Sequence, residues 1–313
     1  ICDNALNTVF RWDADGDRVC EEACDPPLEH PFAVDVMPDG DRLICDRSGV
    51  RRVDATGHRR CTYEFSGEFR PGGVLAVNDT VWVTNLARHE IEVFDAASGH
   101  LRRTLGEHGR GPGQFQFPRS LAHMPDGNVC VVDLLNYRLQ VLTPEGEWVR
   151  SIGQHGDSPG AFSRPKDVAV GPDGTIFVTD AFAQRVHALA SDGTPLMTFG
   201  EPQSGVGELT LPSGIAISSR APRTAQKLPP DTQPAYYVLV SEQLNDPGIR
   251  VYAWLGAQEG SLLGFPARET AANWKPRLPG AVAINPHWDP ERCTKCHQSA
   301  GGRLQPIALE ETD

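Results

Sequence analysis

Two stretches of the chain align without a gap and decide its fold. The first is Phe117-Pro-Arg-Ser-Leu-Ala-His-Met-Pro-Asp-Gly-Asn-Val-Cys-Val-Val-Asp133, and the second is Arg164-Pro-Lys-Asp-Val-Ala-Val-Gly-Pro-Asp-Gly-Thr-Ile-Phe-Val-Thr-Asp180. Each has two short apolar runs on either side of a Pro-Asp-Gly turn, which is the pattern of a β-hairpin. The two copies lie 47 residues apart. A period of roughly 40 to 50 residues is typical of one blade of a β-propeller.

The likeness continues beyond these hairpins. Residues 136–146 match residues 183–193, and each copy then ends in a further short strand and a glycine. Every unit therefore carries four short strands, as a propeller blade does. Fainter copies begin at Pro31, at Pro71 and at Leu211. These three units and the aligned pair account for five blades.

A sixth unit is divided between the two ends of the chain. Residues 278–284, Leu-Pro-Gly-Ala-Val-Ala-Ile, match the first strands of the other units, but no second strand follows them. At the other end, Ile1-Cys-Asp3 matches Ile44-Cys-Asp46. We therefore expect a single all-β domain, a six-bladed propeller over residues 1–284, whose last blade is completed by residues 1–24. Closure of this kind removes exposed sheet edges.

These repeats resemble the NHL-repeat family of β-propellers. The resemblance extends over about residues 1–284 and is strongest in the third and fourth blades. It implies the fold but no single function, because propellers of this family serve as binding platforms, lyases and scaffolds. Propeller lyases and lactonases hold a metal in the central channel with His and acidic residues unique to single blades. His123 is the only histidine in an expected first strand, and the sequence offers no matching ligand set.

The C-terminal tail, residues 285–313, carries the motif Cys293-Thr-Lys-Cys-His297. C-x-x-C-H is the attachment sequence of a c-type haem. We expect Cys293 and Cys296 to bond one covalent haem c, and His297 to be the proximal ligand of its iron. A zinc site would need further ligands, and only His287 lies near; a redox dithiol would need a βαβ setting, which this sequence lacks.

The sixth ligand of the iron stays open at this point. His287 lies ten residues before His297 and is a candidate distal ligand, and the adjacent Trp288 is a candidate for packing on the porphyrin. A ligand from a partner and an open coordination site are equally compatible with the sequence. The three methionines are better explained by the blades, and they are Met37, Met124 and Met197.

Charge and cysteine content limit the setting in which the protein works. The net charge of −12 argues against nucleic-acid binding, for which a basic patch is the usual footprint. No apolar run reaches the roughly 18 residues of a membrane helix. Because c-type haem is attached after export, we expect a periplasmic or extracellular protein whose signal peptide has been removed. Disulfides are then allowed. Cys20 and Cys24 are the favoured local pair, and the pairing stays open among Cys2, Cys20, Cys24, Cys45, Cys61 and Cys130.

An acidic series invites a functional interpretation but has a simpler one. Asp3, Asp46, Asp133 and Asp180 occupy the same place at a strand end in their blades, with Asn85 and Glu242 in that place in the two others. A residue that recurs in every blade is best explained as a strand-end acceptor for turn amides. The sequence also lacks a G-x-S-x-G nucleophile elbow.

We therefore interpret the chain as an exported monohaem c-type cytochrome on a propeller platform. It would transfer single electrons as a subunit or partner of a larger redox or cytochrome complex, with no nucleic-acid partner. Electron transfer is preferred over catalysis. The alternatives are a propeller enzyme, an oxidoreductase or lyase with a channel active site and the haem as relay, and a structural subunit of a cytochrome assembly.

Overall fold

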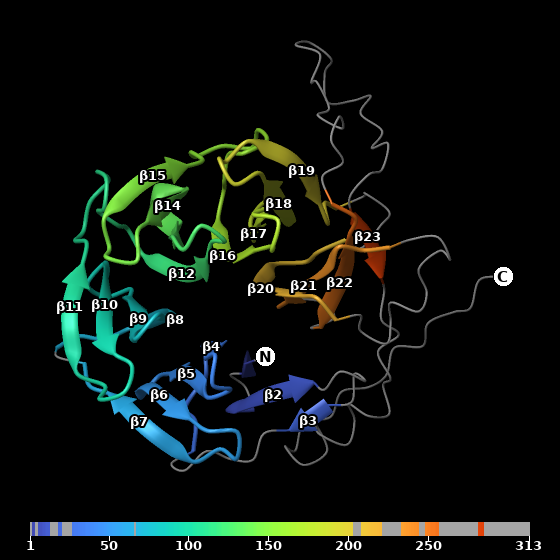
Figure 1. Ribbon diagram of the computed structural model, residues 1–313. Coiled ribbons are helices and arrows are strands. Elements are labelled where there is room, and N and C mark those ends of the chain that lie inside the picture. Colours follow the sequence, from blue (N-terminus) through green and yellow to red (C-terminus); the bar gives the residue numbers. More distant parts are fainter. Residues whose placement is uncertain are drawn as a thin grey trace, which may run out of the picture.

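The computed structural model describes residues 2–3, 6–12, 18–20, 27–65, 67–202, 208–220, 233–243, 248–256 and 281–284. Over these residues the chain is almost entirely β, with one short 3-10 helix, η1 (Leu134–Asn136). The strands form antiparallel sheets arranged as a ring around a central axis, as Figure 1 shows. The protein is therefore an all-β propeller. No helix within the described ranges is long and apolar enough to cross a membrane.

The third and fourth blades match the aligned sequence repeats strand for strand. They contain β12 (Pro118–His123), β13 (Val129–Asp133), β14 (Arg138–Leu142) and β15 (Trp148–Ile152), then β16 (Pro165–Val170), β17 (Ile176–Asp180), β18 (Arg185–Leu189) and β19 (Pro195–Phe199). The Pro-Asp-Gly turn works as the sequence predicts: the Gly127 N–H donates to Met124 O (3.0 Å), and Gly127 has a φ of 87°. This left-handed conformation favours glycine.

The other blades repeat the same order of strands. The first contains β4 (Ala33–Val36), β5 (Arg42–Asp46), β6 (Gly49–Val53) and β7 (Arg59–Tyr63), and the second β8 (Pro71–Val77), β9 (Thr80–Asn85), β10 (Glu90–Asp95) and β11 (Leu101–Leu105). The fifth contains β20 (Pro212–Ser218), β21 (Tyr236–Glu242), β22 (Ile249–Trp254) and β23 (Ala281–Ile284). The first strands β4, β8, β12, β16 and β20 neighbour one another around the axis.

The hydrophobic core lies between neighbouring blades. One buried cluster joins Leu139 and Val141 of the third blade to Phe162, Ile176 and Val178 of the fourth. The second strands β5, β9, β13 and β17 are buried along their whole length because other strands cover both of their faces. Each blade therefore buries its apolar surface against its neighbours, and the ring depends on their mutual contact.

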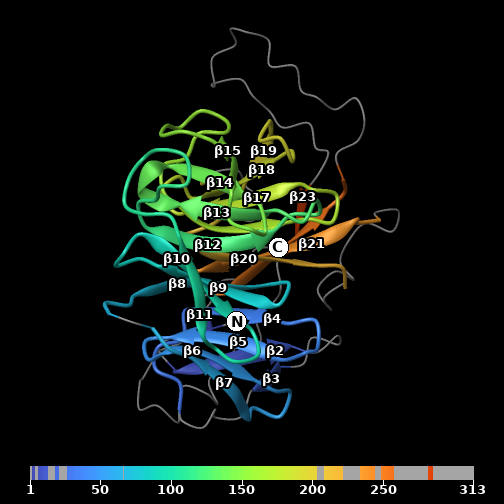
Figure 2. The same ribbon diagram turned by 60° about the vertical axis from the view of Figure 1, so that its left-hand side comes forward.

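The N-terminal strands form a three-stranded sheet beside the first blade. It contains β1 (Cys2–Asp3), β2 (Thr8–Trp12) and β3 (Arg18–Cys20) in that spatial order. Val9 of β2 packs in one buried cluster with Leu28, Ile44 and Val53. Figure 2 shows β2 and β3 beside β4–β7, and Figure 1 shows them between the first and fifth blades of the ring.

The structure corrects the expected role of residues 281–284. We expected them to be the inner strand beside the N-terminal sheet, but β23 pairs with β22 as the fourth, outer strand of the fifth blade. The register joins Val251 to Ile284 and Trp254 to Ala281. Without β23, β22 would be an unpaired sheet edge, which is unfavourable. A run of four small apolar residues suits either position, so the strand pairs with the edge that the preceding strand offers.

Candidate functional site

The expected haem residues lie outside the described part of the chain. These are Cys293, Cys296, His297, His287 and Trp288. The structure therefore leaves the haem attachment, the iron ligands and the packing role of Trp288 as predictions. What it does define is the position and direction of β23, the last described strand before them in the sequence.

The fifth-blade register gives the direction of β23. Pro212 pairs with Glu242 at one end of the sheet, and Tyr236 pairs with Trp254 at the other. Because Ala281 pairs with Trp254, β23 runs from that second end toward the Glu242 end. We call the Glu242 end the acceptor face, defined by the strand-end residues Asp46, Asn85, Asp133, Asp180 and Glu242. At Ile284 the chain is heading toward this face.

The strand-end acceptors are structural, as the sequence predicted. Asp133 accepts the Gln116 N–H (2.7 Å) from the loop before its blade, together with side-chain hydrogen bonds from Arg138 and Gln140. Asp180 accepts the Ser163 N–H (2.6 Å) in the same way. Each acceptor ties the loop entering its own blade to the end of the second strand. Their lone pairs are used within the blade, so they do not form a carboxylate ring for a ligand.

Two side chains on the channel wall share one backbone unit. The Asp35 carboxylate of β4 accepts the Ala76 N–H (2.8 Å), and Nε2 of His123 on β12 donates to Ala76 O (2.6 Å). Because a carbonyl can only accept, this bond places the proton of His123 on Nε2. Burial raises the pKa of Asp35, although the Ala76 and Val36 amides and the nearby His123 oppose that shift. Three first strands are linked by this contact.

A second carboxylate links β12 to the two first strands that follow it, β16 and β20. Asp167 of β16 accepts a hydrogen bond from the Ser120 hydroxyl of β12 and the Ile215 N–H (2.8 Å) of β20. It also accepts the Val168 N–H (2.9 Å). Burial raises the pKa of Asp167, and these three donors oppose the rise. Both oxygens are therefore committed to holding blades together.

A hydroxyl relay adds to this fastening. The Gly73 N–H donates to Thr84 Oγ1 (2.7 Å), and the Thr84 hydroxyl donates to Arg119 O (3.4 Å) of the next blade. The relay recurs two blades further on, through Asp167 N, Thr179 Oγ1 and Ser213 O. The first strands are thus held at one level around the channel.

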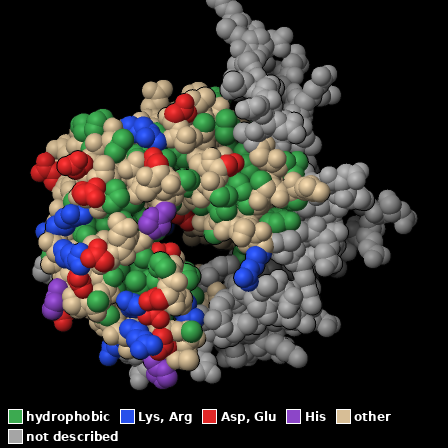
Figure 3. Space-filling model, viewed as in Figure 1, with side chains coloured by type: hydrophobic (Ala, Val, Ile, Leu, Met, Phe, Trp, Pro, Cys, Tyr) green, Lys and Arg blue, Asp and Glu red, His purple; other side chains and the backbone are tan. Residues whose placement is uncertain are grey.

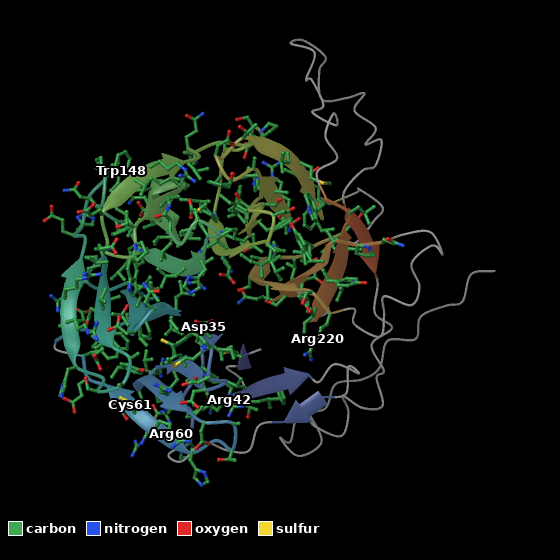
Figure 4. The ribbon with its side chains drawn as sticks, viewed as in Figure 1. Asp35, Arg42, Arg60, Cys61, Trp148 and Arg220 are labelled. Carbon is green, nitrogen blue, oxygen red and sulfur yellow. The ribbon has the colours of Figure 1, made fainter. Side chains whose placement is uncertain are left out.

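Figure 3 shows the channel, and Figure 4 shows where Asp35 lies in the ring. The centre of the space-filling view is hollow, with histidine and acidic side chains at its border. Asp35 lies near the centre, whereas Arg60, Cys61 and Trp148 lie at the outer rim. The channel wall therefore carries polar side chains, but the described residues hold no group of three or more His, Cys, Asp or Glu that could bind a metal.

Sequence reasoning identified His123 but missed both channel carboxylates. Asp167 aligns with Ser120 of the preceding repeat, and Asp35 occupies a first-strand position that is Ala122 in the third blade. The available signal was a carboxylate in a first strand at a position where the other repeat has Ser120 or Ala122. This signal is weak in an alignment of the repeats, because the alignment identifies residues that the blades share and Asp35 and Asp167 each occur in one blade only.

The comparisons with known proteins show the fold alone. No protein-family model and no curated protein sequence matches the chain. Among solved structures, a gluconolactonase from Xanthomonas campestris has 15% identity and a TM-score of 0.52, with 77% of each chain covered. A propeller in a nidogen/laminin complex has 18% identity and a TM-score of 0.53, with 68% of this chain and 77% of that chain covered. A streptogramin B lyase has 16% identity and a TM-score of 0.50, with 68% and 66% covered.

These neighbours define a class, the β-propellers, and nothing narrower. Their printed activities differ from one another, as expected for a fold that hosts many functions. The function of this chain must therefore be argued from its own residues.

Proposed function

We propose that the protein is an exported monohaem c-type cytochrome that transfers single electrons on a propeller platform. The observation that carries the proposal is the sequence Cys293-Thr-Lys-Cys-His297. Two thiolates at this spacing can bond the two vinyl groups of one haem, and the adjacent histidine can ligate the iron from below. In this proposal the propeller completes a ring of six blades, and the tail bears the haem.

The geometry of β23 supports a haem held close to the propeller. Cys293 is the ninth residue after Ile284, so a fully extended chain between them reaches about 30 Å at most. Because β23 is an outer strand that runs toward the acceptor face, this reach begins at the rim of the fifth blade. A haem within this reach could use the propeller surface or a partner as its second wall.

His287 is the proposed distal ligand, and Trp288 is proposed to pack against the porphyrin. Two histidine ligands would fill both axial positions and suit the iron to electron transfer. The proposed partners are other cytochrome or redox subunits. The net charge of −12 would steer a partner with a basic surface toward the protein. The proposed compartment is the periplasm or the extracellular space, where haem attachment of this type takes place.

One observation favours a second candidate, a channel enzyme that uses the haem as an electron relay. Asp35 and His123 meet at the same backbone unit of the channel wall and occur in single blades only. An acid and a histidine placed together are the groups that general acid–base chemistry uses. A structural role in a cytochrome assembly is the third candidate.

Visible spectroscopy of the exported protein tests the main proposal. We expect a c-type spectrum in the reduced and oxidised states that does not change when carbon monoxide is added. The variant C293A/C296A should lose covalent haem while the propeller still folds. A spectrum that shifts with carbon monoxide would favour the channel enzyme or a ligand supplied by a partner. Failure to bind haem in a host that attaches it would overturn the proposal.

The distal ligand has its own test. H287A should open the iron to carbon monoxide, because the coordination site would lose its side-chain ligand. H58A is the matched control, since His58 is an exposed turn residue of the first blade. If both variants keep the original spectrum in the presence of carbon monoxide, His287 is not the ligand.

A further inference from the structure

Four basic side chains gather at one mouth of the channel, on the acceptor face. Arg119 and Lys166 each follow the proline that begins β12 and β16. Arg70 and Arg164 each precede the proline that begins β8 and β16. Because these prolines pair with the strand-end residues Asn85, Asp133 and Asp180, all four lie at the level of the acceptor face. We call these four residues the channel-mouth cluster.

The backbone of the cluster is held firmly by the neighbouring blades. Arg119 O accepts the Thr84 hydroxyl (3.4 Å), and a Cβ on Gly73 would lie only 2.9 Å from the same oxygen. Lys166 Nζ donates to Gln243 Oε1 (3.0 Å), which lies just after β21 in the fifth blade. Arg119 and Lys166 are half-buried, whereas Arg70 and Arg164 are exposed. The cluster therefore has two half-buried cations, Arg119 and Lys166, and two cations that are accessible to solvent, Arg70 and Arg164.

One nearby carboxylate, that of Asp167, opposes the positive charge of the cluster. No carboxylate among the described residues forms an ion pair with any of the four. The oxygens of Asp167 already accept hydrogen bonds from Ser120, Val168 and Ile215. Burial lowers the pKa of Arg119. The charge of Asp167 opposes this shift, and the charges of Arg164 and Arg70 add to it. Burial likewise lowers the pKa of Lys166 to about 8, with Arg119 and Arg164 contributing.

Other arginines of the same face show what a purely structural role requires. Arg51 pairs with Asp46 (2.8 Å), Arg138 with Asp133 (2.9 Å), and Arg250 with Glu242 (2.6 Å). Each of these cations meets the acceptor of its own blade. The channel-mouth cluster has no such acceptor. On a protein with a net charge of −12, four neighbouring cations without a carboxylate partner need another reason.

We propose that the channel-mouth cluster binds a small anionic ligand through its carboxylate or phosphate oxygens. Guanidinium groups donate paired hydrogen bonds that match such oxygens, and a lysine adds a point charge. The partial burial of Arg119 and Lys166 would strengthen these bonds, because the local dielectric constant is lower than that of water. The ligand is expected to be small, since the four cations lie around a single mouth.

The carboxylate could come from two sources. One is a free metabolite, and the other is a propionate of the haem proposed above, because the chain leaves β23 toward this face. The binding site itself does not depend on the haem. The chemistry is shared, and the haem-free variant C293A/C296A separates the two sources.

Isothermal titration calorimetry at pH 7 and constant ionic strength tests the proposal, with citrate and inorganic phosphate as probes. Constant ionic strength is needed because salt screens exposed charges. The haem-free protein should bind at least one probe at a single site. K166Q and R164Q should each weaken binding about tenfold, the loss expected for one charged hydrogen bond. R60Q, the same charge change at the outer rim, should leave it unchanged.

Each outcome decides the proposal. Binding in both the haem-bearing and haem-free proteins supports a free ligand, and binding only without haem supports a propionate as the occupant. R164Q keeps the test valid if K166Q fails to fold, because Arg164 is exposed. Absence of binding to the haem-free protein overturns the proposal, and so does equal weakening by R60Q. If the unmodified protein showed no haem spectrum, the cytochrome function would be refuted, but the result of this titration would still stand.

Discussion

Lys166 offers the most direct measurement at the scale of a single residue. Its pKa is lowered to about 8 by burial and by the charges of Arg119 and Arg164. The chain has only four lysines, Lys166, Lys227, Lys275 and Lys295, so a ¹³C-lysine NMR titration gives few signals. We expect one signal to titrate near pH 8 and to be absent in K166R. R119Q should raise that pKa, because one repelling charge is removed.

The same shift predicts a dependence of stability on pH. An unfolded lysine has a higher pKa than folded Lys166, so above about pH 8 the unfolded chain binds more protons than the native state. The contribution of Lys166 to stability therefore rises with pH over this window. K166R should remove this component of the pH dependence. A Lys166 signal that titrates like a free lysine would refute both expectations.

Asp167 is the residue whose loss should cost most on the channel wall. It accepts hydrogen bonds from Ser120, Val168 and Ile215, and an asparagine offers only one oxygen to these donors. We expect D167N to lower the free energy of unfolding by about 1–3 kcal/mol, since a buried donor is left unpaired. Denaturant unfolding measures this. D192N, in an exposed turn, is the control and should change stability by less than about 0.5 kcal/mol; equal effects would contradict the argument.

At the residue scale, the sequence predicted the role of residues that recur in every blade, but it did not predict the role of residues that occur in a single blade. The strand-end series from Asp46 to Glu242 was interpreted correctly as structural, because recurrence in every blade indicates a common need of the fold. Asp35 and Asp167 differ from their counterparts, and their partners Ala76 and Ile215 lie in neighbouring blades. Contacts between blades depend on how the repeats pack, which a single repeat does not reveal.

At the scale of elements, the approach of β8 to β12 sets a strict limit on side-chain size. A Cβ on Gly73 would lie 2.9 Å from Arg119 O and 3.1 Å from Ser120 Cα, both of which are backbone atoms. The next blades carry Ser120 and Asp167 at the equivalent position. The restriction therefore belongs to this pair of blades and not to the repeat.

Replacement of Gly73 should for this reason destabilise the propeller. We expect G73A to lower the free energy of unfolding by about 1–3 kcal/mol, because the strands must move apart to admit a methyl group. G111A is the matched control, since its Cβ would meet only the flexible side chain of Gln114. Thermal unfolding compares the two variants. A G73A protein as stable as G111A would show that the blades separate at no cost.

Element type was easier to predict than element position. The Pro-Asp-Gly turns and short apolar runs predicted the strands of the third and fourth blades closely, because their signals are local. Residues 281–284 were correctly predicted as a strand, yet they pair with β22 and not beside the N-terminal sheet. Pairing partners far apart in the sequence are chosen by the edges available, and an apolar run of four residues fits several edges.

At the scale of the whole molecule, the pairing of β23 determines how the ring closes and where the tail begins. Ala253 and Val282 face each other across β22 and β23. Opposite residues of antiparallel strands are close enough for a disulfide. If residues 281–284 instead lay beside β1, Val282 would approach the N-terminal strand, which carries the native Cys2. Cysteine cross-linking can therefore separate the two arrangements.

We expect A253C/V282C to form a disulfide on mild oxidation and to gain roughly 3 kcal/mol of stability, as closing a loop of this length does. Peptide mapping under non-reducing conditions identifies the bond despite the native cysteines, and unfolding with and without reductant measures the gain. V282C alone is the control and should give no cross-link. A bond between Cys2 and the new cysteine of V282C would move residues 281–284 beside the N-terminal sheet. The haem tail would then begin at the channel and not at the rim of the fifth blade. It would start at the mouth opposite the channel-mouth cluster, because the first strands of the blades begin at the acceptor face and run away from it.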